Sequence, residues 1–103
     1  MKVVDTRDHE WFLFEHEGHL YLDINCNLSA IGYSYMIQLN DAELESYQAG
    51  GRHYLSKLAQ EVEYSAPILP DSTSIYKSRR VAYEVSELTT EAVKEWRGNT
   101  NFS

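Results

Sequence analysis

Cysteine, long apolar runs and, in the first half of the chain, cationic residues are scarce in this sequence. The 103 residues include one cysteine, Cys26, so no disulfide can form within the chain and nothing points to secretion. The opening residues, MKVVDTRDHEW, lack the apolar segment of a signal peptide. No run of about 18 apolar residues occurs, so we expect no membrane span. These absences favour a soluble, cytoplasmic protein.

Lysine and arginine are absent between Arg7 and Arg52. Residues 1–51 therefore carry nine acidic residues against two basic ones, a net charge of −7, whereas residues 52–103 carry seven of each. Because phosphates need cations, we do not expect the first half to bind nucleic acid. The asymmetry favours either a basic protein partner or simply a solvated acidic face.

The apolar and aromatic content of the chain predicts a folded protein. Hydrophobic residues make up 43% of the chain and aromatic residues 13%, which is typical of a globule with its own core. The length predicts one domain over residues 1–98, followed by a frayed tail at 99–103.

Alternation with a period of two predicts three consecutive strands. Residues 11–16 and 19–28 form a β-hairpin around a turn at Glu17 and Gly18, and residues 29–40 form the third strand. In the second of these strands Cys26 shares its face with four aliphatic residues, while the opposite face is polar. Short connections make the three strands an antiparallel meander.

A long helix is predicted to begin after Asn40. Glu43 lies three positions on, so the two residues match a capping box. An apolar stripe continues to Val62 and keeps its phase across Gly50 and Gly51, which favours one helix over two. On this helix Gly51 would face inward and allow close approach to the sheet.

After a loop at residues 64–74, residues 75–85 are predicted to form a fourth strand. A short terminal helix follows, with Thr89 as its N-cap and Gly98 as its stop. The predicted order is β-β-β-α-β-α. It indicates an α+β fold with a four-stranded, mainly antiparallel sheet, one long helix across one face and a short C-terminal helix.

Motifs for catalysis, metal binding or cofactor binding are weak. His16 and His19 flank a turn and are read as exposed rather than as metal ligands, and Cys26 is read as a small core residue. The segment GYSYM lacks the final glycine of a nucleophile elbow, and AGGR lacks the spacing of a phosphate loop. We therefore expect no catalytic residue, no metal and no cofactor.

Two sets of charged residues, one acidic and one basic, are interpreted as structural rather than functional. Glu15, Glu17 and Asp23 lie at a turn or on the polar phase of a strand, so we expect them to be solvated rather than to act as acid and base. Lys77, Arg79 and Arg80 form the one basic cluster, which we expect to pair with acidic residues of the same chain.

The polar face of the second predicted strand is the strongest candidate for a binding surface. It combines acidic groups with a tyrosine and asparagines, and tyrosine is enriched in protein interfaces. Together with the hairpin, this face gives the predicted partner-binding residues Glu15, Glu17, His19, Tyr21, Asp23 and Asn25. The competing interpretation is that the C-terminal helix covers this face through Trp96, or that a second subunit does.

These features favour a non-enzymatic protein-binding module, such as a small acidic bacterial inhibitor that neutralises a basic toxin or nuclease. The alternative is a small enzyme or ligand-binding protein with a pocket between the long helix and the sheet. The residues that would line this pocket are Tyr33, Tyr35, Tyr47 and Tyr54. A third hypothesis is a homodimer joined by a self-complementary sheet face.

Overall fold

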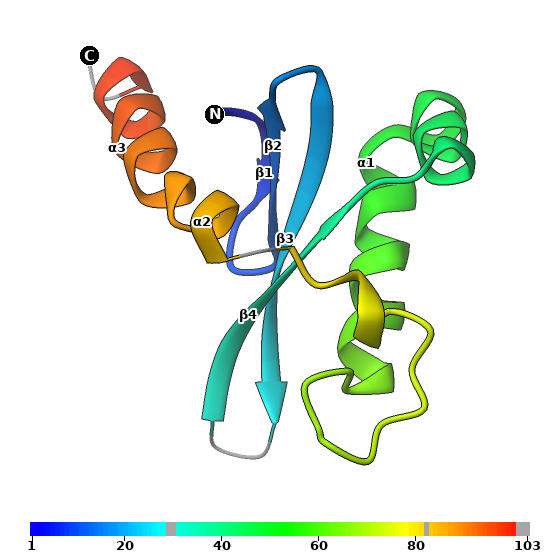
Figure 1. Ribbon diagram of the computed structural model, residues 1–103. Helices are drawn as coiled ribbons and strands as arrows, with labels where there is room; N and C mark the ends of the chain where they lie inside the picture. The colour runs from blue at the N-terminus through cyan, green and yellow to red at the C-terminus, as the bar shows by residue number, and fades with distance from the viewer. Residues whose placement is uncertain (29–30, 82, 101–103) are drawn as a thin grey trace.

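A computed structural model describes residues 1–28, 31–81 and 83–100 of the chain. The elements, in order, are β1 (Lys2–Arg7), β2 (Trp11–His16), β3 (His19–Leu28), β4 (Ile31–Gln38), α1 (Asp41–Ser65), a 3-10 turn (Lys77–Arg79), α2 (Tyr83–Ser86) and α3 (Leu88–Thr100). The four strands form one antiparallel sheet in the order β1-β2-β3-β4. Figure 1 shows α1 on one side of this sheet and α2 and α3 on the other. The predicted α+β class is confirmed.

The β2–β3 hairpin follows the prediction. His16 pairs with His19, and the two residues between them have positive φ angles of 52° at Glu17 and 80° at Gly18. Two successive left-handed residues give the type of turn whose twist matches that of the strands. The turn fixes the register, and with it the side chains that face each layer.

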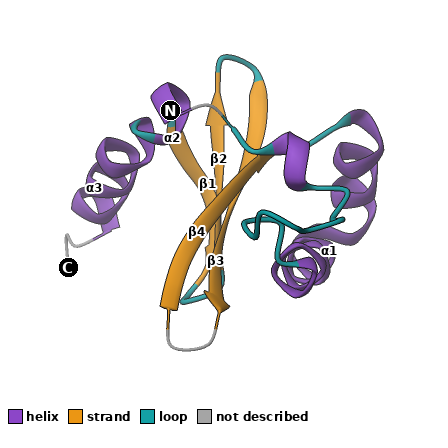
Figure 2. Ribbon diagram, turned by 60° about the horizontal axis from the view of Figure 1, so that its bottom comes forward, coloured by secondary structure: helices purple, strands orange, loops and turns teal. Residues whose placement is uncertain are grey.

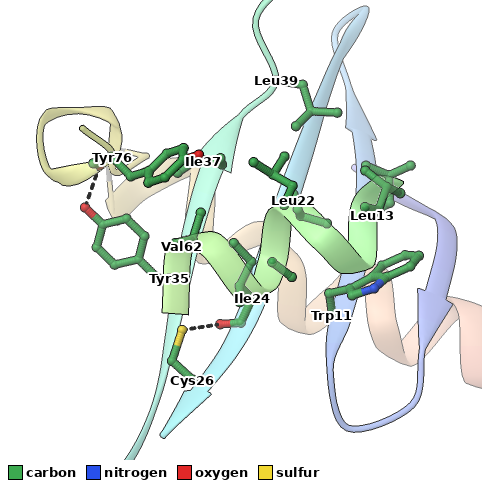
Figure 3. Close-up of a cluster of buried hydrophobic side chains, with 13 residues drawn as sticks. Trp11, Leu13, Leu22, Ile24, Cys26, Tyr35, Ile37, Leu39, Val62 and Tyr76 are labelled. Atoms are coloured by element: carbon green, nitrogen blue, oxygen red, sulfur yellow. Dashed lines mark hydrogen bonds between the residues drawn. The ribbon is translucent and has the colours of Figure 1, made fainter. Parts of the chain in front are cut away.

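The main core lies between α1 and the sheet. Alternate residues of β2, β3 and β4 point into it, and Figure 3 shows them meeting side chains of α1. Leu55, Leu58 and Val62 supply the helix side and are 0–2% exposed. The sheet side comprises Trp11, Leu13, Leu22, Ile24, Cys26, Tyr35 and Ile37. Burial of this apolar surface is the main force that holds the two layers together.

The fourth strand is not the predicted one. The N-terminal residues form β1, in which Val3 pairs with Phe14 and Thr6 with Phe12. The predicted strand at 75–85 instead contains the 3-10 turn and α2, with one isolated bridge from Arg80 to β4. The physical reason is that Tyr76 turns into the main core, where it is 7% exposed, so this segment leaves the sheet plane.

The predicted cap of α1 is present. The backbone N–H of Glu43 donates to the Asn40 side chain at 2.8 Å, and the backbone N–H of Asn40 donates to the Glu43 carboxylate at 2.9 Å. Each side chain therefore satisfies a backbone donor that the helix itself leaves unpaired.

The interpretation of α1 as one uninterrupted helix is wrong. Gly51 has φ 58° and ψ −140°, so two helical segments meet there at a kink. A Cβ placed on Gly51 would meet nothing within 4 Å, so close packing on the sheet does not explain this glycine. The backbone conformation at position 51 explains the glycine, because residues with a side chain rarely adopt these φ and ψ angles. The bend is visible in Figure 2.

The terminal helix is longer than predicted. It begins at Leu88, and the Thr89 hydroxyl donates to the Ser86 carbonyl at 2.8 Å instead of capping the helix. Gly98 lies inside the helix rather than ending it. Of the predicted tail, residues 99–100 are helical and residues 101–103 lie outside the described residues. Residues 29–30, at the start of the predicted third strand, also lie outside them.

Among the helices of the described ranges, none combines the length and the apolar character needed to cross a bilayer.

Candidate functional site

The second face of the sheet is partly covered by the C-terminal helices. Phe14, Tyr21 and Met36 point away from α1 and form a second buried cluster with Ala92 of α3. Tyr21 is 7% exposed in this cluster. The competing interpretation, coverage by the C-terminal helix, therefore holds for this part of the face.

A groove remains where α3 leaves the sheet. It has a volume of about 560 Å³ and lies between the open side of α3 and the polar residues of β3 and β4. Asp23, Asn25 and Ser34 line it from the sheet, while Val93 and Lys94 line it from the helix. Its volume lies within the range of about 300–1,000 Å³ that is typical of ligand sites.

Aromatic rings complete the groove. Phe12 and Phe14 line it and stack on each other, with centroids 5.8 Å apart and planes at 18°. Trp96 of α3 meets Phe12 edge-on. The groove thus combines an apolar surface with a few polar groups, as ligand sites commonly do.

Asp23 is the most unusual group in the groove. Burial raises the pKa of its carboxyl from 3.8 to about 6, and no hydrogen bond or ion pair reaches this carboxyl from the described residues. Its register neighbours are Phe12 on β2 and Met36 on β4, which explains the loss of water. Asp23 is therefore only partly exposed to solvent, rather than fully solvated as expected. A carboxyl of this kind can exchange a proton close to neutral pH.

The six predicted partner-binding residues do not form one surface. Glu15, Glu17 and His19 are exposed at the β2–β3 hairpin, Asp23 and Asn25 line the groove, and buried Tyr21 lies between the two sets. Strand periodicity placed His19, Tyr21, Asp23 and Asn25 on one face of β3, whereas Glu15 lies on the opposite face of the sheet and Glu17 in the turn. Periodicity gave no sign that a distant helix would cover the middle of this β3 face.

The hairpin lies at the same end of the molecule as the start of α1, as Figure 1 shows. The backbone N–H of Leu39 donates to the Leu20 carbonyl at 2.9 Å, and the side chains of Gln38 and His19 are 3.2 Å apart. These contacts bring the first turns of α1 close to the hairpin. We call the exposed carboxylates of Glu15, Glu17, Asp41 and Glu45 the acidic end.

Several arginines pair with carboxylates that lie outside the acidic end. Arg52 reaches Asp5 at 3.3 Å, and Arg7 lies beside Glu10. Arg79 donates to the Glu43 carboxylate at 2.8 Å, so the expected internal pairing of the basic cluster is confirmed for this arginine.

The other two members of the basic cluster also make internal contacts. Arg80 lies over the Tyr35 ring at 5.3 Å from its centroid. The Lys77 ammonium donates to the carbonyls of Leu69 and Pro70.

The four tyrosines of the alternative pocket do not gather around an opening. Tyr35 is 1% exposed, and its hydroxyl donates to the carbonyls of Tyr76 and Lys77 at 2.9 and 3.1 Å. The other three, Tyr33, Tyr47 and Tyr54, pack around the edge of the main core. Burial raises the pKa of Tyr33 to about 12, so its hydroxyl keeps its proton.

Cys26 is a core residue, as predicted. It is fully buried, and burial raises the pKa of its thiol to about 11, so it is not a reactive thiolate at neutral pH. Within the described ranges, the histidines, cysteine and carboxylates nowhere form a group of three or more able to hold a metal ion.

Comparison of the chain with family models, with curated proteins and with solved structures gave no significant match.

Proposed function

We propose that the protein is a non-enzymatic protein-binding module that recognises a basic partner through the acidic end. The observation that carries the proposal is the position of exposed carboxylates on two neighbouring elements, the hairpin and the start of α1. Glu15 and Glu17 belong to the first, and Asp41 and Glu45 to the second. Acidic surfaces of this kind raise the rate of association with cationic proteins.

The internal ion pairs support this proposal. Arg79 and Arg52 form ion pairs with Glu43 and Asp5, two carboxylates outside the acidic end. Lys2 lies opposite Glu15 in the β1–β2 register, but no ion pair joins the two side chains among the described residues. The surplus of negative charge is thus kept at this end. A small inhibitor that neutralises a basic toxin or nuclease fits this charge distribution.

The test is affinity capture from a host lysate with three forms of the protein. The first is the wild type, and the second carries Glu15→Gln, Glu17→Gln and Glu45→Gln. The third carries Glu84→Gln, Glu87→Gln and Glu91→Gln, which remove the same charge from exposed positions of the C-terminal region. We expect basic proteins to be retained by the wild type and the third form, and to be lost from the second.

Salt provides an independent readout. Raising the salt from about 50 to 500 mM shortens the Debye length to a few ångströms and should release a partner held by the acidic end. Equal retention by both triple variants, or retention that does not change with salt, would contradict the proposal.

A further inference from the structure

The groove beside α3 carries charges of both signs. Asp23 supplies a carboxylate from the sheet and Lys94 an ammonium group from the helix, while Asp8, Glu10 and Arg97 also line the groove. No ion pair joins Asp23 to Lys94 in the part of the chain that the structure describes. Each charge therefore keeps its capacity to bind a group of the opposite sign.

The region of the groove that carries these charges is apolar in part. Phe12 and Val93 line it from the sheet and the helix, and Asn25 and Ser34 add hydrogen-bonding groups at its open side. A simple cation would be repelled by Lys94, and a simple anion would be repelled by Asp23. A ligand that carries both charges on an apolar body meets neither penalty.

We propose that this groove binds a small zwitterion, with its ammonium group at Asp23, its apolar body against Phe12 and its anionic group toward Lys94. The site is separate from the acidic end, and the inference goes beyond the proposed recognition of a basic partner. Because Asp23 lacks a hydrogen-bond donor among the described residues, a ligand ammonium would restore the interactions that this carboxylate lost on burial.

The spacing of the charges selects the kind of zwitterion. Asp23 and Lys94 are not in contact, so the two ligand charges should lie at opposite ends of the apolar body rather than on one carbon atom. An aromatic ring is a suitable body, because it can pack against the ring of Phe12.

Three probes with the same ring test this inference. These are para-(aminomethyl)benzoate, which carries both charges, benzylamine, which carries only the ammonium, and para-toluate, which carries only the carboxylate. Each is titrated into nitrogen-15-labelled protein at about pH 7.5, where Asp23 is ionised. We expect the zwitterion to shift the amides of Asp23, Asn25 and Ser34 and to bind about two- to fivefold more tightly than either single-charge probe.

Two variants assign the charges. Asp23→Asn should abolish the advantage of the zwitterion over para-toluate, and Lys94→Gln should abolish its advantage over benzylamine. Lys57→Gln removes a lysine from the exposed side of α1 and should change neither. The variant with three glutamines in the acidic end should bind the probes like the wild type, so the two proposals fail independently.

Two outcomes would overturn the inference. One is the lack of any saturable shift of the groove amides up to about 20 mM of each probe, a limit that corresponds to a very weak site. The other is binding of the zwitterion that is no tighter than that of benzylamine and is unaffected by Asp23→Asn and Lys94→Gln.

Discussion

The indole ring of Trp96 in α3 meets the ring of Phe12 in β2 edge-on, with centroids 5.7 Å apart and ring planes at 90°. Edge-to-face contact is a favoured geometry for aromatic pairs. This contact fixes α3 over β1 and β2 and leaves the polar residues of β3 open. It therefore decides which part of the second sheet face is core and which part is groove.

Removal of this contact should loosen α3. We expect Trp96→Ala to lower the free energy of unfolding by about 1–3 kcal/mol, through lost apolar contact and lost ring geometry. Urea unfolding would measure the loss, and the ring-proton shifts of Phe12 should move toward random-coil values. Glu95→Ala, at an exposed position of the same helix, should leave both readouts close to those of the wild type.

The Glu43–Arg79 pair should contribute to stability. Burial by itself would raise the pKa of Glu43, but hydrogen bonds from Arg79 and from the Asn40 backbone outweigh burial and hold the pKa below its usual range. The stability that this pair provides is therefore present above the pKa of Glu43 in the unfolded chain. It is lost as the pH falls through the lower pKa of the folded state.

We expect Glu43→Gln to destabilise the protein by about 2–3 kcal/mol at neutral pH, because it leaves Arg79 without its counter-ion and weakens the helix cap. Chemical denaturation would measure this loss. Glu45→Gln, on an exposed position of the same helix turn, should change stability by less than about 0.5 kcal/mol. Equal effects of the two substitutions would show that the pair does not stabilise the fold.

Gly51 should resist substitution. Its φ of 58° and ψ of −140° are unfavourable for any residue with a Cβ, so Gly51→Ala should cost about 1–3 kcal/mol although nothing lies within 4 Å of the new methyl group. Gly98→Ala provides the comparison, since Gly98 is helical with open space around it. That change should be neutral or stabilising by up to about 1 kcal/mol. A neutral Gly51→Ala would mean that the helix runs straight.

Asp23 should make stability depend on pH in the opposite direction from Glu43. Burial raises its pKa from 3.8 to about 6 in the folded state, so folding favours the protonated form. The associated stability is fully present below about pH 3.8 and is lost as the pH rises through about 6.

Asp23→Asn removes this pH dependence. We expect the variant to be more stable than the wild type by about 1–3 kcal/mol at neutral pH, and by little below about pH 4. Urea unfolding across this pH range would show the difference, with Asp71→Asn in an exposed loop as the control. A constant difference between wild type and Asp23→Asn at all pH values would contradict the raised pKa.

The hydroxyl of Tyr35 should stabilise the segment that was predicted to be a strand. It donates to the carbonyls of Tyr76 and Lys77 at the start of the 3-10 turn. Tyr35→Phe should therefore cost about 1–2 kcal/mol, since it leaves two partly buried acceptors with fewer partners. Thermal unfolding would measure the loss, and Tyr64→Phe, at a side chain that is 93% exposed, should have no effect.

Local patterns were reliable where the responsible interactions are local. The hairpin turn at Glu17 and Gly18, the capping box of Asn40 and Glu43, and the burial of Cys26 are all confirmed. Each depends on backbone preferences or on period-two alternation within a few residues. The same reasoning missed the kink at Gly51, because an apolar stripe can keep its phase across one residue with a non-helical backbone.

Predictions that required knowledge of distant contacts were less successful. The N-terminal residues of β1 include the β-branched Val3, Val4 and Thr6, which favour a strand, whereas the predicted strand at 75–85 leaves the sheet because Tyr76 packs in the core. For the candidate site, periodicity placed Tyr21, Asp23 and Asn25 on one face. It did not reveal which of them α3 would cover.

Propensity, turn chemistry and composition act over short distances, and they suffice to predict the α+β class, the hairpin, the helix cap and the uneven distribution of charge. Contacts between distant segments determine which strand completes the sheet, why Tyr21 is buried, and why Asp23 is partly desolvated without a described partner. These outcomes depend on side chains brought together from distant parts of the chain, where burial and desolvation are set by packing.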